Sequence, residues 1–309
     1  MTGSSEPPEL SEVIARLSAL LGQRTGTIEQ LRRGVTNRAF KVDFADAAYV
    51  VQLAGPESEQ LGIDREVECN ANKRAGELGI APPVAALLHE PSCLVTMFIP
   101  GRQPTAEELR EPAQLARVAR TLHVLHDSGE RLSARFDPFR TIEAYAEGAT
   151  DAGVEIPGDR KERRSRLRKA EKALAGRRRL EPVPCHNDLL ANNFTLDGDR
   201  LVLYDWEYAG MGDPYFDLGN FAASNELDAA AEEGLLDAYF GEPPTAQSRA
   251  ILRLMRYLSD VRDGMWGLFQ SGISERQIDF DGWGHKHLER ATAAGEAPEF
   301  RTWLKEASG

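Results

Sequence analysis

VPCHNDLLANNFTLDGDRLVLYDWEYAGMGDPYFDLGN, residues 183–220, is the stretch that decides how the whole sequence is interpreted. A His-x-Asp sequence is followed by Asn193 and then by two short apolar runs on either side of Asp197-Gly198-Asp199. Apolar runs that flank such a turn are typical of a β-hairpin. Because the two ends of a hairpin lie side by side, we expect Asn193, before the first strand, to lie near Asp205, after the second.

This order of polar residues fits phosphoryl transfer. That reaction needs an acceptor hydroxyl held in line and metal ions that carry charge off the phosphate oxygens. Asp188 would orient the hydroxyl and accept its proton, while Asn193 and Asp205 offer the hard oxygen ligands that Mg²⁺ prefers. Each residue taken alone fits a turn or a helix cap better. Their combined spacing favours a kinase-type site.

Composition limits the partners of the protein. The chain has 309 residues, enough for one large or two moderate domains, and a formal net charge of −12. An acidic protein repels polyanions, so the charge argues against nucleic acid and favours a small cationic substrate. The cysteines, Cys69, Cys93 and Cys185, have no paired spacing, which predicts reduced thiols.

The start of the chain, MTGSSEPPEL, has neither the basic nor the apolar region of a signal peptide. No apolar run is long enough to span a bilayer. We therefore expect a cytoplasmic protein without a membrane partner. The sequence leaves both a monomer and a homodimer open.

Residues 1–98 carry the pattern of a small β-rich lobe. Apolar residues at helical spacing predict one helix, and β-prone runs broken by turn residues predict an antiparallel sheet. A second helix at 64–78 would start at Asp64, a capping residue type, and end before Gly79. The other expected segments are a helix at 10–21 and strands at 27–31, 39–44, 49–53, 84–88 and 93–99.

Two places in this lobe are candidates for nucleotide binding. The turn at 33–37 offers backbone N–H groups and short polar side chains suited to phosphate, although taken alone it fits an ordinary hairpin turn better. Its candidate residues are Gly34, Thr36 and Asn37. Met97 and Phe98, at the end of the last strand, would contact an adenine ring, although such residues more often belong to a core.

Residues 99–103 form the expected hinge, and helical spacing dominates after it. Residues 104–309 are therefore predicted as a larger, mostly helical lobe. Within it, residues 160–179 carry Arg or Lys at eleven positions, and we interpret them as a solvated helix face because no aromatic residues interleave. The other expected helical segments are 105–108, 112–126, 227–240, 245–270 and 283–305.

Aromatic residues gather in the C-terminal part of this lobe. Trp266 and Phe269 lie three positions apart in a helical segment. Such a pair usually belongs to a core, but it can also receive a quaternary ammonium group by cation–π attraction. His285 and His287 are predicted surface residues.

Taken together, these motifs resemble the choline/ethanolamine kinase branch of the aminoglycoside phosphotransferase superfamily, which has a protein-kinase-like fold. The resemblance runs from Gly34 to about Ser274. Its most specific segments are 186–193 (HNDLLANN), 205–209 (DWEYA) and 216–220 (FDLGN). It implies an α+β, two-lobed fold, with a small antiparallel-sheet N-terminal lobe carrying one main helix and a larger, mostly helical C-terminal lobe.

The resemblance also implies roles for residues. Asp188 would be the catalytic aspartate, assisted by Asn193. Asn193 and Asp205 would bind Mg²⁺, and Glu207 would be a further carboxylate for metal or substrate. The implied cofactors are ATP and Mg²⁺. Glu68 is similar to the family's helix glutamate at the nucleotide site, and Trp266 and Phe269 to residues that face the trimethylammonium group of choline.

Gln52 departs from the family pattern. These kinases usually carry a Lys or Arg there, on the third strand, which touches the phosphates and pairs with the helix glutamate. An amide brings no positive charge, so phosphate binding should weaken and Glu68 should lose its ion-pair partner. Three explanations are open: a slow enzyme, a protein that binds nucleotide without turnover, or replacement by a neighbouring cation such as Arg33, Arg38 or Lys41.

The leading hypothesis is ATP- and Mg²⁺-dependent phosphorylation of the hydroxyl of an amino alcohol such as choline or ethanolamine. An alternative keeps the reaction and changes the acceptor to an aminoglycoside, thiamine or another hydroxylated amine. A third hypothesis, motivated by Gln52, is a non-catalytic nucleotide-binding protein. A protein kinase is not expected, since the short segment between Asp205 and Asp217 leaves no room for an activation loop.

Overall fold

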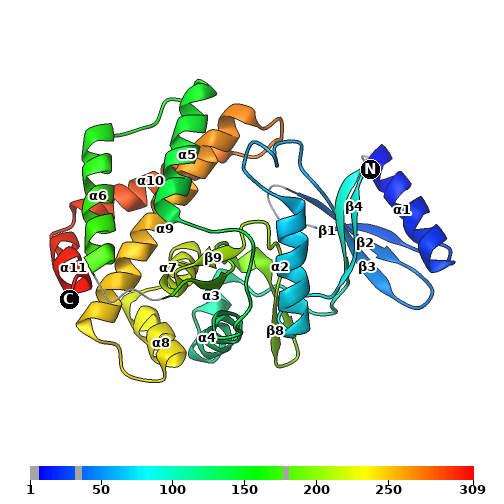
Figure 1. The fold of residues 1–309 in the computed structure, drawn as a ribbon, viewed down its shortest axis with the longest axis horizontal. Coiled ribbons are helices and arrows are strands. Elements are labelled where there is room, and N and C mark those ends of the chain that lie inside the picture. The colour runs from blue at the N-terminus through cyan, green and yellow to red at the C-terminus, as the bar shows by residue number, and fades with distance from the viewer. Residues whose placement is uncertain (1–6, 32–36, 177–180) are drawn as a thin grey trace. The chain divides into compact units, whose positions relative to one another are not determined.

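The computed structural model describes residues 7–31, 37–176 and 181–309 (Figure 1). The chain divides into two compact units. The first comprises Met1–Pro104 and Asn192–Tyr208, and the second Thr105–Ala191 and Ala209–Gly309. The sequence-based division had placed 192–208 in the C-terminal lobe, so the compact units and the predicted lobes differ at this segment.

The first unit is built on a five-stranded antiparallel sheet with the order β1-β2-β3-β5-β4. The helix α1 (Pro8–Leu21) places Leu10, Val13 and Leu17 in the same apolar core as Val42 and Val51. Alternation along β2 directs every second side chain into that core. The strands are β1 (Ile28–Leu31), β2 (Arg38–Asp43), β3 (Ala48–Leu53), β4 (Val84–His89) and β5 (Ser92–Met97).

The main helix of the first unit, α2 (Arg65–Glu77), begins where the sequence predicted. The Asp64 side chain accepts hydrogen bonds from the backbone N–H groups of Glu66 and Val67, which caps the first turn. This cap fixes Arg65 as the first helical residue and Glu68 one turn later, where their side chains share a face.

The hairpin of β7 (Phe194–Asp197) and β8 (Arg200–Leu203) has the predicted register, with Phe194 opposite Leu203. Residues 101–103 lie along β7: Arg102 and Leu196 exchange backbone hydrogen bonds of 3.2 and 2.8 Å. A Cβ atom on Gly101 would lie 2.4 Å from the carbonyl oxygen of Leu196, so only glycine fits this approach. The hairpin therefore belongs to the first unit through backbone pairing.

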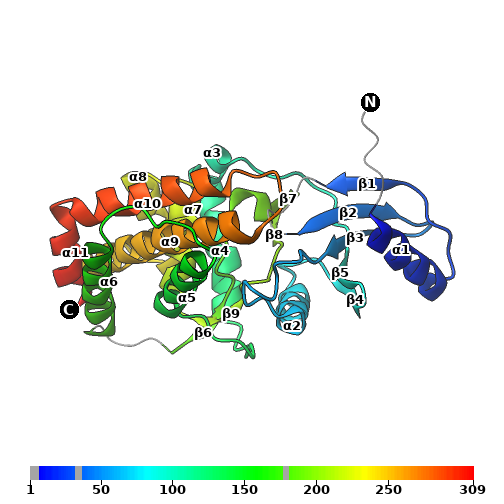
Figure 2. The same cartoon turned by 90° about the horizontal axis from the view of Figure 1, so that it is seen from above.

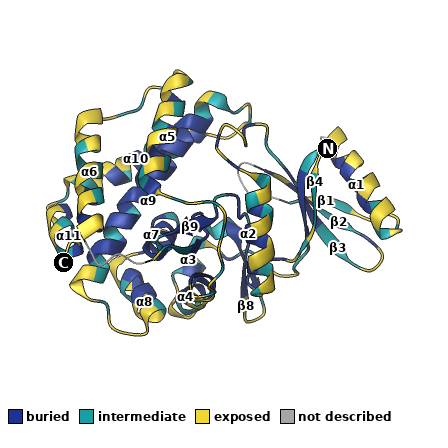
Figure 3. Cartoon of the chain, in the orientation of Figure 1, coloured by how far each residue is buried: buried dark blue, intermediate teal, exposed yellow. Residues whose placement is uncertain are grey.

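The second unit is helical around α9 (Ala246–Ile273), which is buried along much of its length (Figure 3). Figure 2 shows α10 and α5 on either side of α9. Two short strands, β6 (Val183–Cys185) and β9 (Gly210–Gly212), pair with each other in this unit. The remaining helices are α3 (Ala106–Leu109), α4 (Pro112–His126), α5 (Pro138–Asp151), α6 (Arg160–Gly176), α7 (Pro214–Ser224), α8 (Ala229–Phe240), α10 (Phe280–Glu296) and α11 (Glu299–Ala307).

Glycines let α9 and α10 approach closely. A Cβ atom on Gly267 would lie 2.7 Å from the backbone nitrogen of Gly284, and one on Gly264 would lie 2.6 Å from Cγ of Leu288. The helices therefore meet almost backbone to backbone. The segment 283–305 was expected as one helix, but the structure ends α10 at Glu296 and restarts after Pro298 as α11.

The α+β, two-lobed fold expected from sequence is confirmed. Within the described ranges, no helix has both the length and the apolar character needed to cross a lipid bilayer.

Candidate active site

The β7–β8 hairpin brings the backbone of Asn193 to Tyr204, whose N–H donates to the Asn193 carbonyl at 2.9 Å. Asp205 follows directly and adopts a left-handed backbone, with φ of 64°. Non-glycine residues rarely take this conformation, and where they do it often serves a site. The two ends of the hairpin thus bring Asn193 and Asp205 close together in the backbone, as the sequence pattern predicted.

Amide side chains orient the Asp205 carboxylate. Its Oδ1 accepts from Nε2 of Gln52 at 3.0 Å and from Nδ2 of Asn37 at 3.4 Å. Removal from water raises the pKa of Asp205, while Arg65 and the two amides act in the opposite direction. The net upward direction of the pKa shows that this carboxylate lacks full compensation of its charge.

Glu207 lies in the same cluster and is buried. Its Oε2 accepts from Nδ2 of Asn37 at 2.8 Å and lies 3.6 Å from Nη1 of Arg65. Asn37 therefore donates to both carboxylates, Asp205 and Glu207, and accepts at Oδ1 from Nη2 of Arg65 at 2.8 Å.

The prediction that Glu68 lacks an ion-pair partner is wrong. Arg65, one turn earlier on α2, places Nη1 2.5 Å from Oε2 of Glu68. Both side chains are buried, with exposed fractions of 12% and 1%. Burial, together with the nearby Asp205, raises the pKa of Glu68 to about 7 in spite of Arg65. The positive charge absent from β3 at Gln52 is thus present on α2.

The cations suggested by sequence have other partners. Arg38 lies 3.7 Å from Glu9, and Lys41 pairs with Asp43 at 3.0 Å and stacks over the ring of Phe98 at 4.9 Å. Met97, the last residue of β5, is partly buried and pairs with Tyr49 in the sheet. Arg33, Gly34 and Thr36 lie outside the described residues.

This cluster has the donors of a cation site. Among the described residues, it combines the carboxylates of Glu68, Asp205 and Glu207 with the single guanidinium of Arg65. Carboxylate and amide oxygens suit Mg²⁺, and an added cation would compensate the remaining negative charge. The residues present therefore fit the metal implied by the sequence.

Asp188 lies in the second unit, on a loop whose backbone is held by Asp217 of α7. The carboxylate of Asp217 accepts from the backbone N–H of His186 at 2.9 Å and of Asn187 at 2.7 Å. It also contacts Nε2 of His126 at 2.9 Å. Burial opposes ionisation, but these hydrogen bonds hold the pKa of Asp217 below its usual value. An ionised buried carboxylate thus fixes the turn before Asp188.

His126, Cys185 and Asp217 could be mistaken for a metal site, because their ligand atoms lie within 4.8 Å of one another. Asp217 already accepts the hydrogen bonds described above, and Nδ1 of His126 lies 2.7 Å from the hydroxyl of Tyr239. Burial raises the pKa of the Cys185 thiol, which disfavours the thiolate that a metal needs. We interpret the cluster as structural support for the loop.

Arg262 of α9 is a neighbour of Asp188 that the sequence pattern did not reveal. Its Nη2 donates to the carbonyl of Asn187, and its Nη1 lies 3.9 Å from Oδ1 of Asp188. The guanidinium is 3% exposed and also pairs with Asp263 at 3.1 Å. Asn187 itself has a φ of 67°, so Arg262 supports a backbone conformation that is unfavourable for most residues.

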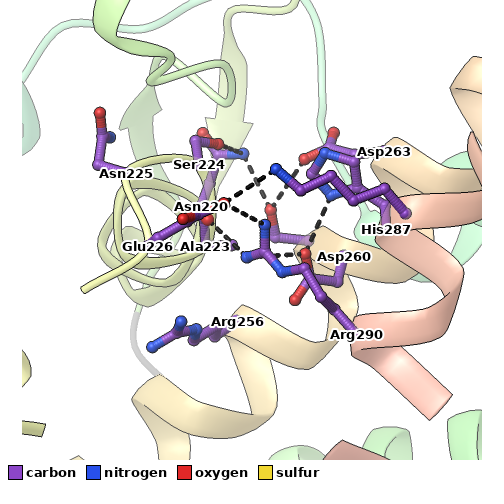
Figure 4. A network of polar contacts seen from close by, with 12 residues as sticks. Asn220, Ala223, Ser224, Asn225, Glu226, Arg256, Asp260, Asp263, His287 and Arg290 are labelled. Atoms are coloured by element: carbon purple, nitrogen blue, oxygen red, sulfur yellow. Dashed lines mark hydrogen bonds and ion pairs between the residues drawn. The ribbon is translucent and has the colours of Figure 1, made fainter. Parts of the chain in front are cut away.

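A polar network continues from this loop across α7, α9 and α10 (Figure 4). The backbone N–H of Leu189 donates to Oδ1 of Asn220 at 2.6 Å, and Nδ2 of Asn220 donates to Ser259 at 3.0 Å. Nearby, Nδ1 of His287 lies 3.0 Å from Asp260. His287 is buried, so its predicted surface position is wrong, whereas His285 is half-buried.

Trp266 and Phe269 are both buried and contact different helices. Trp266 packs edge-on against Phe280 and Trp283 of α10. Phe269 contacts Tyr145 of α5 at 6.3 Å between ring centroids and covers Gly148. These ring contacts are those of a core, and a role toward substrate stays a prediction.

Comparison with known proteins agrees with this chemistry. A model of the phosphotransferase enzyme family (APH) matches residues 27–252. The protein LicA of Haemophilus influenzae is 24% identical over 268 residues, covering 83% of this chain and 97% of LicA. Ethanolamine kinase 2 of Mus musculus is 26% identical over 289 residues, covering 82% of this chain and 72% of that protein.

A solved structure, the choline/ethanolamine kinase family protein from Mesorhizobium loti, is also similar. It shares 28% sequence identity and a TM-score of 0.82, and the match covers 97% of this chain and 99% of that one. Because the family model matches most of the chain, the chain belongs to the phosphotransferase enzyme family.

Proposed function

We propose that the protein transfers the γ-phosphoryl group of ATP, with Mg²⁺, to the hydroxyl of an amino alcohol such as choline or ethanolamine. The observation that carries the proposal is the excess of carboxylates, those of Asp205, Glu207 and Glu68, over the guanidinium of Arg65 among the described residues. A protein tolerates such an excess when a cation joins it. The similar proteins are named as kinases of these alcohols.

In this proposal, Asn193 and Asp205 hold magnesium and Glu207 serves as a further carboxylate for metal or substrate. Mg²⁺, when bound, would compensate the negative charge that develops on the transferring phosphate. Gln52 and Asn37 keep the Asp205 carboxylate oriented before the metal arrives, because both amides donate to its Oδ1. Preorganisation of this kind lowers the cost of forming the site.

Nucleotide binding is assigned to the same unit. Arg65 replaces the strand cation as the partner of Glu68. The turn residues Gly34 and Thr36 would cover phosphate oxygens with Asn37. Met97 and Phe98 would contact the adenine ring.

Asp188 is the proposed acceptor-side residue. It would accept a hydrogen bond from the acceptor hydroxyl and take its proton as the new O–P bond forms. Arg262 is its charged neighbour, with Nη1 3.9 Å from Oδ1 of Asp188. Trp266, Phe269 and Glu207 are proposed to contact the ammonium end of the acceptor, since aromatic faces and carboxylates attract such cations.

A steady-state assay tests the proposal. The purified protein is mixed with ATP, Mg²⁺ and choline or ethanolamine, ADP release is followed, and the phosphorylated alcohol is identified by ³¹P NMR. We expect acceptor-dependent ADP release that is lost with EDTA. The variant Asp188→Asn should lower kcat by about 10²–10⁴-fold while its melting temperature stays close to wild type.

Acceptor screening separates the alternatives. Turnover with an aminoglycoside, thiamine or another hydroxylated amine, but not with choline or ethanolamine, would retain the reaction and change the substrate class. A rise in melting temperature with Mg²⁺–ATP, combined with no ADP release for any acceptor, would favour a non-catalytic nucleotide-binding protein.

A further inference from the structure

A cavity of about 290 Å³ lies in the second unit and is lined by residues of α6, α9 and α10. Leu288 and Ala291 of α10 give it an apolar wall. Arg163 and Arg166 of α6 and Tyr257 of α9 bring polar groups to the same cavity. The function proposed above uses none of these residues.

Arg163 carries a positive charge in this cavity that has no close acidic partner. Its Nη1 donates to the carbonyl of Pro157 at 2.9 Å, and within the described residues its guanidinium forms no salt bridge. Asp159 acts on it from beyond salt-bridge distance, and Oδ1 of Asp159 already accepts from the backbone N–H groups of Lys161 and Glu162. Removal from water lowers the pKa of Arg163, but a guanidinium stays charged at neutral pH. An anion would stabilise this half-buried charge.

Tyr257 brings a hydroxyl to the same cavity. The residue is 2% exposed, and its ring packs edge-on against Phe300 of α11, with 5.1 Å between the ring centroids. Burial raises the pKa of Tyr257 to about 12, although the positive charges of Arg166 and Arg163 act in the opposite direction. The hydroxyl therefore keeps its proton at neutral pH, and in the described part of the chain no residue accepts a hydrogen bond from it.

Acidic side chains border the same cavity at its solvent side. Glu162 and Glu296 line it, and their side chains are 61% and 62% exposed. Arg166, whose side chain is 16% exposed, contacts them through Nη2 at 2.8 and 3.3 Å. Positive charge thus lies toward the interior of the cavity and negative charge toward the solvent.

We propose that this cavity binds a small zwitterion, a phosphate monoester that also carries a primary ammonium group. Its phosphate would accept hydrogen bonds from Arg163 and Tyr257 and compensate the charge of the arginine. Its ammonium group would donate to the carboxylates of Glu162 and Glu296. Phosphorylation of an amino alcohol yields compounds of this class, but neither the site nor its test depends on that reaction.

The arrangement disfavours simpler ligands. A metal cation would be repelled by Arg163, and the carboxylates of Glu162 and Glu296 already pair with Arg166. An anion without an ammonium group would be repelled by the two glutamates at the solvent side. A zwitterion brings the opposite charge to each end of the cavity.

Isothermal titration calorimetry with phosphoethanolamine tests the proposal on the full chain. In buffer with EDTA and without nucleotide, wild type should bind saturably, and Arg163→Gln and Tyr257→Phe should each weaken binding by about tenfold or more. Tyr257→Phe removes only the hydroxyl and keeps the ring that packs on Phe300. Arg164→Gln is the matched control, because it makes the same change at an exposed site of α6 outside this cavity, and it should bind as wild type does.

Inorganic phosphate and ethanolamine, titrated separately, test the two ends of the site. Each should bind more weakly than phosphoethanolamine, and Glu296→Gln should weaken the binding of phosphoethanolamine without weakening that of phosphate. Circular dichroism confirms that each variant is folded. The proposal is overturned if wild type does not bind phosphoethanolamine or binds phosphate equally well. It is also overturned if Arg163→Gln or Tyr257→Phe keeps wild-type affinity, or if Arg164→Gln loses as much affinity as they do.

Discussion

Arg65 places one positive charge among the carboxylates of Glu68, Glu207 and Asp205 in the first unit. Its guanidinium also donates to Asn37 and Ser58, both through Nη2. Breaking a buried ion pair by removing one partner leaves an uncompensated charge, which costs more than the pair contributed. Among the residues that the structure describes, the cluster therefore takes its positive charge from Arg65.

Substitution of Arg65 measures that dependence. Arg65→Met keeps an unbranched apolar stem and removes the charge, and we expect the free energy of unfolding to fall by about 3–5 kcal/mol. Urea unfolding followed by fluorescence measures the change. Arg74→Met, at an exposed site of the same helix, serves as the control and should change stability by less than about 1 kcal/mol. Equal losses in the two variants would contradict the assignment.

Glu68 makes stability depend on pH near neutrality. Its pKa is about 7 in the folded protein against an ordinary value of 4.5, so the folded state holds its proton more tightly. The stabilising contribution is complete below pH 4.5 and is lost as pH rises through about 7. The loss approaches ~3 kcal/mol, since each pKa unit corresponds to about 1.4 kcal/mol.

The variant Glu68→Gln tests this contribution, because glutamine is neutral at every pH. In buffer without divalent cations, the stability of wild type relative to the variant should fall between pH 4.5 and 7 and stay level above that range. Unfolding by urea at a series of pH values provides the measurement. A constant difference across the series would show that Glu68 titrates elsewhere.

Single residues were the hardest to predict from sequence. Gln52 was recognised as a departure, but Arg65 was overlooked because it is the first residue of α2 and its direction follows from the cap at Asp64. Arg262 and Asn187 lie far apart in the sequence, so their hydrogen bond could not be predicted from it. Tertiary contacts of this kind leave no periodic signal.

Among the elements, the pairing of residues 101–103 with β7 ties the predicted hinge to the hairpin. The Leu196 carbonyl and Cγ2 of Thr195 would lie 2.4 and 2.7 Å from a Cβ atom at Gly101. Any side chain there forces backbone movement, because the nearest atom belongs to the main chain.

Gly101→Ala should accordingly lower the free energy of unfolding by about 1–3 kcal/mol. Gly234→Ala is a suitable control, because Gly234 lies inside α8 and a Cβ atom there meets only Cδ1 of Leu115 at 3.5 Å. Alanine favours helix, so the control should be neutral or stabilising by up to about 1 kcal/mol. Thermal unfolding of both variants compares them, and an unperturbed Gly101→Ala protein would disprove the close approach.

Elements with strong patterns were predicted well and weak ones were not. The span of α4 matched its apolar periodicity, and the β7–β8 hairpin matched its turn signal. The helix α5 was not predicted, although Ile142, Tyr145 and Ala149 lie at helical spacing on its buried face. The break between α10 and α11 lies at Pro298, a signal present in the sequence that the continuous spacing concealed.

The charge of the whole molecule bears on the acceptor. A net charge of −12 creates a field that attracts cations and weakens as salt screens it. For the proposed function, kcat/KM for choline should fall by up to about tenfold as ionic strength rises at saturating Mg²⁺–ATP.

An uncharged tert-butyl analogue of choline provides the control, because it keeps the shape of the acceptor and loses the charge. Its kcat/KM should change little with salt. Parallel salt dependence for both acceptors would show that the field does not act on the acceptor.

At the scale of the whole molecule, the family could be predicted from the sequence. The resemblance to choline and ethanolamine kinases rested on clustered motifs, and the family match confirms this resemblance. The α+β class followed from the change of sequence pattern at residues 99–103. Short β-prone runs precede these residues, and helical spacing follows them. The assignment of 192–208 to the first unit could not be foreseen, since it depends on backbone pairing between distant segments.

The Arg65–Glu68 pair also affects how degenerate kinases are recognised. One criterion for an inactive member is the absence of a basic residue from the third strand. By that criterion Gln52 would mark this chain as inactive. The positive charge lies instead on Arg65, thirteen positions after Gln52 and on the next secondary-structure element. Its acidic partner, Glu68, is at the expected position. A screen that instead asks which cation reaches the helix glutamate would retain this chain among the candidates for working enzymes.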